Sequence, residues 1–145
     1  MAVKYIPEGY HSVTPYLIVR GAAKVLDFVK QTFDAQETFR MPGPDGTIAH
    51  AEFKIGNSPL MISDGGPEYG PMPCSLYVYV QDVDAVYKRA LQAGGISVKE
   101  PANQFYGDRT ASVKDACGNL WGIGTHIEDV PPEELEKRAK EARHK

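Results

Sequence analysis

A histidine and a glutamate stand two positions apart, at 50 and 52, in a stretch that is typical of a β-strand. Successive side chains of a strand point to opposite faces, so His50 and Glu52 are expected to share one face. An imidazole beside a carboxylate can act as a general base, or it can supply two ligands of a metal site. His50 and Glu52 are therefore the candidate catalytic residues, with an ordinary hydrogen-bonded pair as the alternative.

Two further histidines can supply a third group for such a site. His11 precedes the first predicted strand, and His126 ends the last one. Either of them joins His50 and Glu52 only if the fold brings it near. A histidine at the surface is the simpler interpretation of both.

Aromatic and hydroxyl side chains form a second group of candidates. In the segments 14–19 and 75–80, aliphatic residues alternate with tyrosines and other residues. We expect the aliphatic set to lie under a helix and the tyrosines to face a cavity, although tyrosines also fill the centres of sheets for packing alone. The candidate ligand-binding residues are Thr14, Tyr16, Tyr77, Tyr79, Phe105, Tyr106 and Arg109.

Arg109 has a particular role among these candidates, because its guanidinium is planar and always charged. It follows the aromatic pair Phe105-Tyr106 and one aspartate, at the entrance of a predicted strand. Such a group can hold a carboxylate or phosphate of a ligand with two parallel hydrogen bonds. A local ion pair is the alternative.

Hydrophobic periodicity and turn residues predict the elements that position these side chains. The first half is predicted to contain a strand, a helix that begins after Gly21, and three further strands. The same order returns in the second half, where Asp82 is a predicted helix N-cap. The predicted strands cover residues 13–19, 36–41, 47–55 and 58–63, and then 75–80, 96–99, 109–115 and 120–126.

The two halves also match in sequence. Tyr16-Leu17-Ile18-Val19 aligns with Tyr77-Val78-Tyr79-Val80, and the apolar helix positions follow at one common spacing. A unit of this size cannot cover its own sheet, so two units are expected to pair. We predict an α+β fold in which two paired βαβββ modules, about residues 12–64 and 74–127, form a curved mixed sheet around a cavity, with the helices on the outer face.

The domain organisation follows from this repeat. Residues 1–130 are predicted to form one domain, and residues 131–145 a charged C-terminal tail helix. The sequence does not say whether the modules pair within one chain or swap between two subunits. It also leaves the role of the tail helix open.

Composition excludes several classes of function. The net charge of -3 provides no basic surface for a nucleic-acid backbone, and no apolar run reaches the length of a membrane span or a signal peptide. We therefore expect a cytoplasmic protein with neither nucleic acid nor membrane as a partner. The only cysteines, Cys74 and Cys117, have neither the spacing of a zinc site nor the number of a disulfide framework.

Several motifs together resemble the vicinal oxygen chelate superfamily, which includes glyoxalase I, extradiol dioxygenases, fosfomycin-resistance enzymes and bleomycin-resistance proteins. The likeness is strongest to its uncharacterised glyoxalase-like bacterial members and covers about residues 11 to 130. The motifs are Thr14-Pro15-Tyr16-Leu17, Ile48-Ala49-His50-Ala51-Glu52, Met61-Ile62-Ser63-Asp64, Tyr106-Gly107-Asp108-Arg109 and Asp115-Ala116-Cys117-Gly118-Asn119-Leu120-Trp121.

The resemblance implies a metal position that this sequence fills poorly. Enzymes of the family hold a divalent metal through histidine or glutamate on four strands, and the matching positions here are Thr14, Ile62, Ser75 and Gly122. A hydroxyl binds such metals weakly, and isoleucine and glycine side chains offer no donor. We therefore expect no cofactor, since a divalent metal is unsupported at these positions, and the resemblance then implies the metal-free branch.

These observations predict a metal-free, homodimeric protein that binds a small molecule and sequesters an aromatic or antibiotic-like ligand. The alternative is an enzyme, a glyoxalase-like lyase or isomerase that uses His50 and Glu52 as an acid-base pair or as relocated metal ligands. A third interpretation is an interaction module that uses the tail helix and an open sheet edge. The sequence does not identify the ligand or decide whether catalysis occurs.

Overall fold

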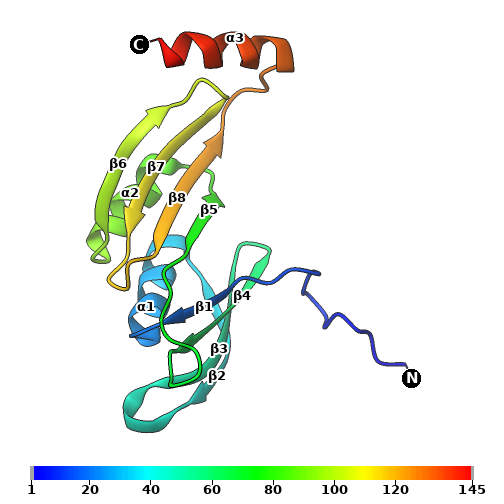
Figure 1. Cartoon of the computed structure of the whole chain (residues 1–145), viewed down its shortest axis with the longest axis vertical. Coiled ribbons are helices and arrows are strands. Elements are labelled where there is room, and N and C mark those ends of the chain that lie inside the picture. The colour runs from blue at the N-terminus through cyan, green and yellow to red at the C-terminus, as the bar shows by residue number, and fades with distance from the viewer. Residues whose placement is uncertain (1, 145) are drawn as a thin grey trace. The chain divides into compact units, whose positions relative to one another are not determined.

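The computed structural model describes residues 2–144, and its element order is βαβββ in each half (Figure 1). The first half contains β1 (Tyr16–Val19), α1 (Ala22–Phe33), β2 (Gln36–Pro42), the 3-10 turn η1 (Pro44–Gly46), β3 (Ile48–Ile55) and β4 (Ser58–Asp64). The second half contains β5 (Ser75–Tyr79), α2 (Val83–Gln92), β6 (Ile96–Asn103), β7 (Asp108–Lys114), β8 (Leu120–His126) and then α3 (Pro132–Arg143). The predicted repeat of strand, helix and three strands is confirmed.

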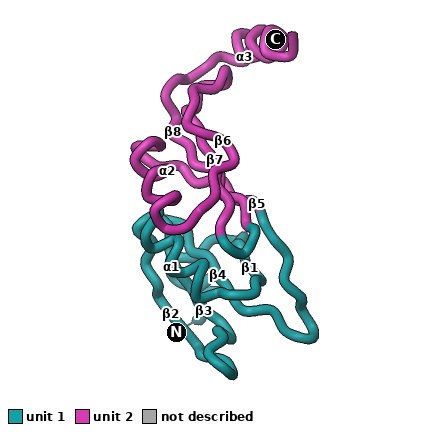
Figure 2. Tube along the Cα trace, turned by 90° about the vertical axis from the view of Figure 1, so that its left-hand side faces the viewer, with its two compact units in different colours: residues 1–74, 116–118 teal, residues 75–115, 119–145 magenta. Residues whose placement is uncertain are grey.

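Each half has its own four-stranded mixed sheet. The strand order is β1-β4-β3-β2 in one and β5-β8-β7-β6 in the other, and in both the first pair is parallel and the others are antiparallel. The chain divides into two compact units, which contain residues 2–74 with 116–118 and residues 75–115 with 119–144 (Figure 2). The α+β class is confirmed.

Unit 1 has its core between α1 and its sheet. Val25, Leu26 and Val29 recur at helical spacing on the buried face of α1, which packs against β3 and β4. Leu17 and Val19 of β1 are buried on the same side of the sheet, as predicted. The face of the sheet away from α1, called here the open face, therefore carries the alternate residues of each strand.

Asp64 holds the start of α1. Gly21 precedes the helix with a φ of 115°, a conformation that glycine adopts without strain, and offers no side chain as a cap. Instead, the Asp64 carboxylate at the end of β4 accepts hydrogen bonds from the backbone N–H groups of Gly21, Ala22 and Ile48, at 2.7, 3.0 and 2.7 Å. Burial raises the pKa of Asp64, but these three bonds outweigh it and hold the pKa below its ordinary value.

Unit 2 is built in the same way. The side chain of Asp82 caps α2 by accepting a hydrogen bond from the N–H of Ala85 at 3.1 Å, which confirms the predicted N-cap. Trp121 lies fully buried in the core, and its indole N–H donates to Asp115 at 2.8 Å. Asp115 also accepts two bonds from Asn119 in the turn before β8. The segment from Asp115 to Trp121 is therefore a structural motif.

Two strands differ from their predicted lengths. β1 begins at Tyr16 and not at residue 13, because Pro15 has no N–H and contributes only its carbonyl oxygen, to Met61. β6 continues to Asn103 through Pro101, although the sequence suggested an end near residue 99. A proline is tolerated there because β6 is an edge strand.

The tail helix α3 is attached to unit 2 by one arginine. Arg138 donates to both carboxylate oxygens of Glu128, at 2.9 and 3.0 Å, and to the backbone carbonyl of Phe105 at 3.2 Å. None of the described residues of α3 is buried. Among residues 2–144, the helices are all too short or too polar to span a membrane.

Candidate functional site

The open face of unit 1 carries a chain of hydrogen bonds through the candidate catalytic pair. Tyr16 Oη lies 3.1 Å from His50 Nδ1, and His50 Nε2 lies 2.8 Å from Glu52 Oε2. The other carboxylate oxygen of Glu52 accepts a hydrogen bond from Tyr10, in the segment before β1. The predicted shared face of His50 and Glu52 is confirmed. Tyr16 meets them because β1 and β3 both flank β4.

Electrostatics fixes the protonation pattern of this chain. The hydrogen bond from Tyr10, and then the one from His50, lower the pKa of Glu52, so that its carboxylate is ionised at neutral pH. An ionised carboxylate only accepts hydrogen bonds, so in a neutral imidazole the proton sits on Nε2 of His50. Nδ1 is then the acceptor for the hydroxyl of Tyr16. Burial and the neighbouring Glu52 raise the pKa of Tyr10 to about 12, so Tyr10 keeps its proton.

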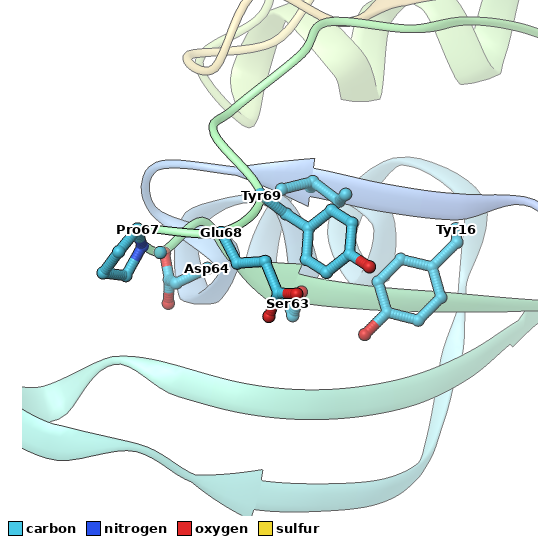
Figure 3. Close-up of a pocket in the computed structure, with 8 residues that line it drawn as sticks. Tyr16, Ser63, Asp64, Pro67, Glu68 and Tyr69 are labelled. Carbon is cyan, nitrogen blue, oxygen red and sulfur yellow. The ribbon is translucent and has the colours of Figure 1, made fainter.

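Tyr16 also borders a hollow of about 480 Å³ beside the same sheet (Figure 3). We call it the Tyr16 hollow. One side is the open face at the ends of β1 and β4, and the other is the segment 66–69, where Tyr69 extends toward Tyr16. Its walls are mainly apolar. The lining residues are Tyr16, Ile18, Ser63, Asp64, Gly66, Pro67, Glu68 and Tyr69.

Backbone hydrogen bonds to the edge strand β1 hold the outer wall in place. The N–H of Gly65 donates to the carbonyl of Val19 at 2.7 Å, and the N–H of Met72 donates to the carbonyl of Ile18 at 3.0 Å. Gly65 allows a close approach at the bend, because a Cβ there lies 3.0 to 3.1 Å from Pro71 and the Tyr69 carbonyl and those neighbours have to shift to admit a side chain. The wall is therefore a fixed part of unit 1.

The face of the unit 2 sheet away from α2, which is the open face of that unit, carries a second cluster around Asp108. The hydroxyls of Tyr77 and Tyr79 both donate to one carboxylate oxygen of Asp108, at 2.9 and 3.0 Å. His126 Nδ1 lies 2.9 Å from the other oxygen, and His126 Nε2 lies 2.7 Å from Asp129. Asp108 is only 5% exposed, and three side chains satisfy its charge.

Two glycines make room for Tyr77 in this cluster. Its ring lies over Gly122 and Gly124 of β8, where an added Cβ lies 3.0 Å from Cδ2 and 2.5 Å from Cζ of the ring. Any side chain at Gly124 thus displaces the ring from its position beside Asp108. The ring of Tyr79 packs against that of Tyr77 edge to face, with centroids 5.1 Å apart.

The charges in the cluster favour an ionised aspartate and a protonated histidine. Burial raises the pKa of Asp108, but the hydrogen bonds from His126, Tyr77 and Tyr79 outweigh it and lower that pKa. The hydrogen bond to Asp108, followed by the one to Asp129, raises the pKa of His126. Burial and then Asp108 raise the pKa of Tyr77, and the hydrogen bond to Asp108 raises that of Tyr79. Both tyrosines therefore keep their protons at neutral pH.

The four positions matched to the family's metal ligands do not form a donor set. Ile62 alternates with Met61 and Ser63 and lies fully buried on the helix side, so its position does not face the open side at all. Gly122 faces the open side but is covered by Tyr77. Thr14 and Ser75 offer one hydroxyl each, a weak donor for zinc, iron or nickel. Within residues 2–144, no three histidine, cysteine, aspartate or glutamate side chains gather as a metal-binding group.

Arg109 does not join the tyrosines, contrary to the expectation that it faces the cavity. It shares the helix side of β7 with the buried Ala111 and Val113, while Asp108 takes the open side. Its guanidinium forms an ion pair with Asp84 of α2, at 3.0 and 3.2 Å, and donates to Asn103. This is the local ion pair that the sequence left as an alternative.

The remaining candidates lie at different places. Phe105 and Tyr106 occupy the turn before β7 and pack edge to face with ring centroids 5.3 Å apart. Tyr106 lies near enough to Tyr77 and Tyr79 to influence their pKa values. Thr14 precedes β1 and is not among the lining residues of the Tyr16 hollow. The structure thus brings together Tyr16, His50 and Glu52 in unit 1, and the two tyrosines of β5 in unit 2.

Sequence reasoning missed Asp108 as the centre of the second cluster and did not pair His126 with it, although the His126 side chain is 51% exposed and so lies at the surface as expected. One signal for them was present. Asp108 falls on the strand face opposite Ala111 and Val113, and His126 falls on the same face as Gly122 and Gly124. Small residues beside an aromatic strand indicate a ring lying across them, and such a ring carries its hydroxyl to the next strand.

Comparisons with known proteins agree on the fold. Residues 9–123 match the sequence profile of the family described as Glyoxalase/Bleomycin resistance protein/Dioxygenase superfamily. The chain is similar to the uncharacterised protein Mb0911c of Mycobacterium bovis, with 35% identity over 136 residues that cover 86% of this chain and 90% of the relative.

Solved structures also resemble this chain. The crystal structure of TioX from Micromonospora sp. ML1 has 26% sequence identity and a TM-score of 0.68, and the match covers 81% of this chain and 99% of TioX. Protein PA1353 from Pseudomonas aeruginosa, with 23% identity and a TM-score of 0.65 over 81% of this chain and 99% of its own, shows the likeness of fold alone.

Proposed function

The chain belongs to the Glyoxalase/Bleomycin resistance protein/Dioxygenase superfamily, and we propose that it binds a small, flat aromatic molecule in the Tyr16 hollow without a metal ion. The observation that carries this proposal is the hollow itself. Its volume of about 480 Å³ falls in the usual range for small-molecule sites, and its walls are mainly apolar with a few hydroxyl and carboxylate groups.

The lining indicates what kind of molecule fits. Tyr16 and Tyr69 offer aromatic rings for stacking, and Ile18 adds an aliphatic surface. Asp64 and Glu68 are the only charged residues among those that line the hollow, so an anionic ligand meets repulsion there. The proposed ligand is therefore aromatic and either neutral or positively charged.

The donor chemistry supports a metal-free site. Ile62 is buried away from the open face, Gly122 is covered by a tyrosine ring, and hydroxyls are weak ligands for the metals that the family uses. Tight binding without turnover would then lower the free concentration of a toxic aromatic compound, such as an antibiotic, in the cytoplasm.

This proposal includes the homodimer expected from the resemblance. Sedimentation then has to give twice the chain mass of 15.9 kDa.

The test uses acridine, quinoline and 2-naphthol as probes, with cyclohexanol as a non-aromatic comparison. Binding is followed by saturation-transfer NMR and by calorimetric titration. Tyr69→Ala is expected to weaken binding about twofold to tenfold, because one aromatic contact contributes about 0.5 to 1.5 kcal/mol. Tyr5→Ala is the matched control, since Tyr5 is 94% exposed and lies outside the hollow.

Three outcomes contradict the proposal. The first is the absence of binding by all three aromatic probes, and the second is an equal effect of Tyr69→Ala and Tyr5→Ala. The third is a stoichiometric transition metal in protein purified without chelator, together with loss of binding after treatment with EDTA.

A further inference from the structure

We propose that unit 2 has a second binding site, on the helix side of its sheet, and that this site takes a free amino acid in its zwitterionic form. The site is a hollow of about 540 Å³ between α2 and the edge strand β6, and we call it the Arg109 hollow. It shares no residue with the Tyr16 hollow, so this inference does not depend on the proposed function. Its lining residues are Asp84, Tyr87, Lys88, Glu100, Pro101 and Arg109.

The first support is that three elements of unit 2 present polar side chains to the same space. Asp84, Tyr87 and Lys88 stand at i, i+3 and i+4 of α2, so they share one face of the helix. Glu100 belongs to β6, and Arg109 belongs to β7 beside it. Helix α2 packs against both strands. The walls of the hollow therefore stand on regular elements, which position side chains more precisely than loops do.

The second support is an ion pair that fixes one wall and leaves donors unused. Arg109 donates to the two oxygens of Asp84, at 3.0 and 3.2 Å, and to Asn103 at 3.0 Å. These three bonds leave two of the five N–H groups of the guanidinium for a ligand. Tyr87 is also held in place, because its hydroxyl donates to Ser97 at 2.7 Å.

The third support is a pair of opposite charges that do not neutralise each other. Lys88 and Glu100 both border the hollow, and neither side chain forms an ion pair or hydrogen bond with another residue of the described range 2–144. The charges of Asp84 and Arg109 cancel, so Lys88 gives the hollow a positive end and Glu100 a negative end. A molecule with one group of each sign satisfies both ends, whereas a simple anion is repelled by Glu100 and a simple cation by Lys88.

These groups define the chemical class of the ligand. In a free amino acid the carboxylate and the ammonium group are attached to the same carbon, so both charges fit within one small hollow. Lys88 and the unused N–H groups of Arg109 suit the carboxylate, and Glu100 suits the ammonium group. The rings of Tyr87 and Pro101 offer apolar surface to the side chain of the ligand, so an aliphatic amino acid such as leucine is the expected class.

The experiment titrates the isotope-labelled full-length chain with leucine and follows the amide signals by two-dimensional NMR. Isocaproate is leucine without the amino group and isopentylamine is leucine without the carboxylate, so the three probes share one side chain. Leucine is expected to shift the amide signals around Lys88 and Glu100 in a saturable way, at millimolar concentration because the hollow is open to solvent. Each probe with a single charge is expected to bind about two- to fivefold more weakly, the range for one exposed ion pair.

Two variants that each remove one charge test the two ends of the hollow. Lys88→Gln is expected to weaken the binding of leucine and isocaproate about two- to fivefold, without weakening that of isopentylamine. Glu100→Gln is expected to weaken leucine and isopentylamine by a similar factor, without weakening isocaproate. Lys140→Gln and Glu136→Gln are the matched controls, because they change the net charge equally on α3.

Several outcomes overturn this inference. One is the absence of a saturable shift around Lys88 and Glu100, and another is equal binding of all three probes. Control variants with the same effects as Lys88→Gln and Glu100→Gln overturn it as well. Tyr69→Ala separates the two hollows: leucine binding is expected to stay unchanged in that variant, and a loss there places leucine in the Tyr16 hollow and contradicts the second site.

Discussion

Replacing Gly124 with alanine is expected to displace Tyr77 from the Asp108 cluster. A Cβ on Gly124 lies 2.5 Å from Cζ and 2.7 Å from Cε1 of the tyrosine ring, far inside contact distance. The ring lies against the strand and cannot move toward it, so it has to turn outward. Its hydrogen bond of 2.9 Å to Asp108 is then lost.

The magnitude follows from the contacts that disappear. A hydrogen bond to an ionised group contributes about 1.5 to 3 kcal/mol, and the lost ring contact about 1 kcal/mol for a side chain that is already half exposed. Alanine in a strand recovers about 0.5 to 1 kcal/mol of backbone entropy relative to glycine. The net loss in the free energy of unfolding is therefore about 2 to 3 kcal/mol.

The assay is chemical denaturation followed by tryptophan fluorescence. Trp121 is the only tryptophan in the chain and lies fully buried in unit 2, so its emission reports the unfolding of that unit. The same substitution is made in a Tyr77→Ala background, where no ring obstructs the new methyl group. There the change is expected to be neutral or stabilising by up to about 1 kcal/mol.

A double-mutant cycle of these variants isolates the contact between residues 77 and 124. Gly70→Ala is a control for the glycine-to-alanine change, because a Cβ there meets open space. If Gly124→Ala destabilises the protein equally with and without the tyrosine ring, the packing of Tyr77 over β8 is not the cause, and the reasoning is refuted.

Two other predictions concern buried or paired charges in unit 2. Because Asp108 and Asp129 raise the pKa of His126 above its ordinary 6.5, its protonated form stabilises the folded state below that pH, and the contribution is lost as pH rises through the folded pKa. The difference in unfolding free energy between wild type and His126→Gln should therefore shrink as the pH rises above 6.5, and a difference that grows instead contradicts the pairing. Asp115→Asn should lower the free energy of unfolding by about 2 to 4 kcal/mol, because the amide cannot accept all the bonds from Asn119 and Trp121. An unchanged melting temperature, measured by Trp121 fluorescence, argues against that structural role.

The two open faces show how a repeated fold acquires different chemistry. Tyr16 and Tyr77 align in the repeat, and both hydroxyls meet a side chain from the third strand of their own unit. Tyr16 contacts an imidazole and lies next to a hollow, whereas Tyr77 donates to a buried carboxylate. Only the first arrangement places an imidazole nitrogen beside the tyrosine hydroxyl.

The element order, the repeat and the buried face of β1 could be predicted from the sequence, because they depend on local patterns. The spacing of Val25, Leu26 and Val29 gives α1 one apolar side, and the alternation around Leu17 and Val19 gives β1 its buried face. Strand alternation also placed His50 and Glu52 on one face without any knowledge of their neighbours. Side-chain direction in these cases needs only the residue's own strand.

The composition of both clusters was decided by tertiary structure. Tyr16 and His50 are 34 residues apart and meet because β1 pairs in parallel with β4, a register that no local pattern encodes. The pairing of β3 with β4 also brings Glu52 opposite Met61, so that Glu52 lies in line with Tyr16 across the sheet. The Tyr16 hollow likewise exists only because the segment after β4 is hydrogen-bonded back onto β1. Local periodicity sets which way a side chain points, while strand pairing over long separations sets what it meets.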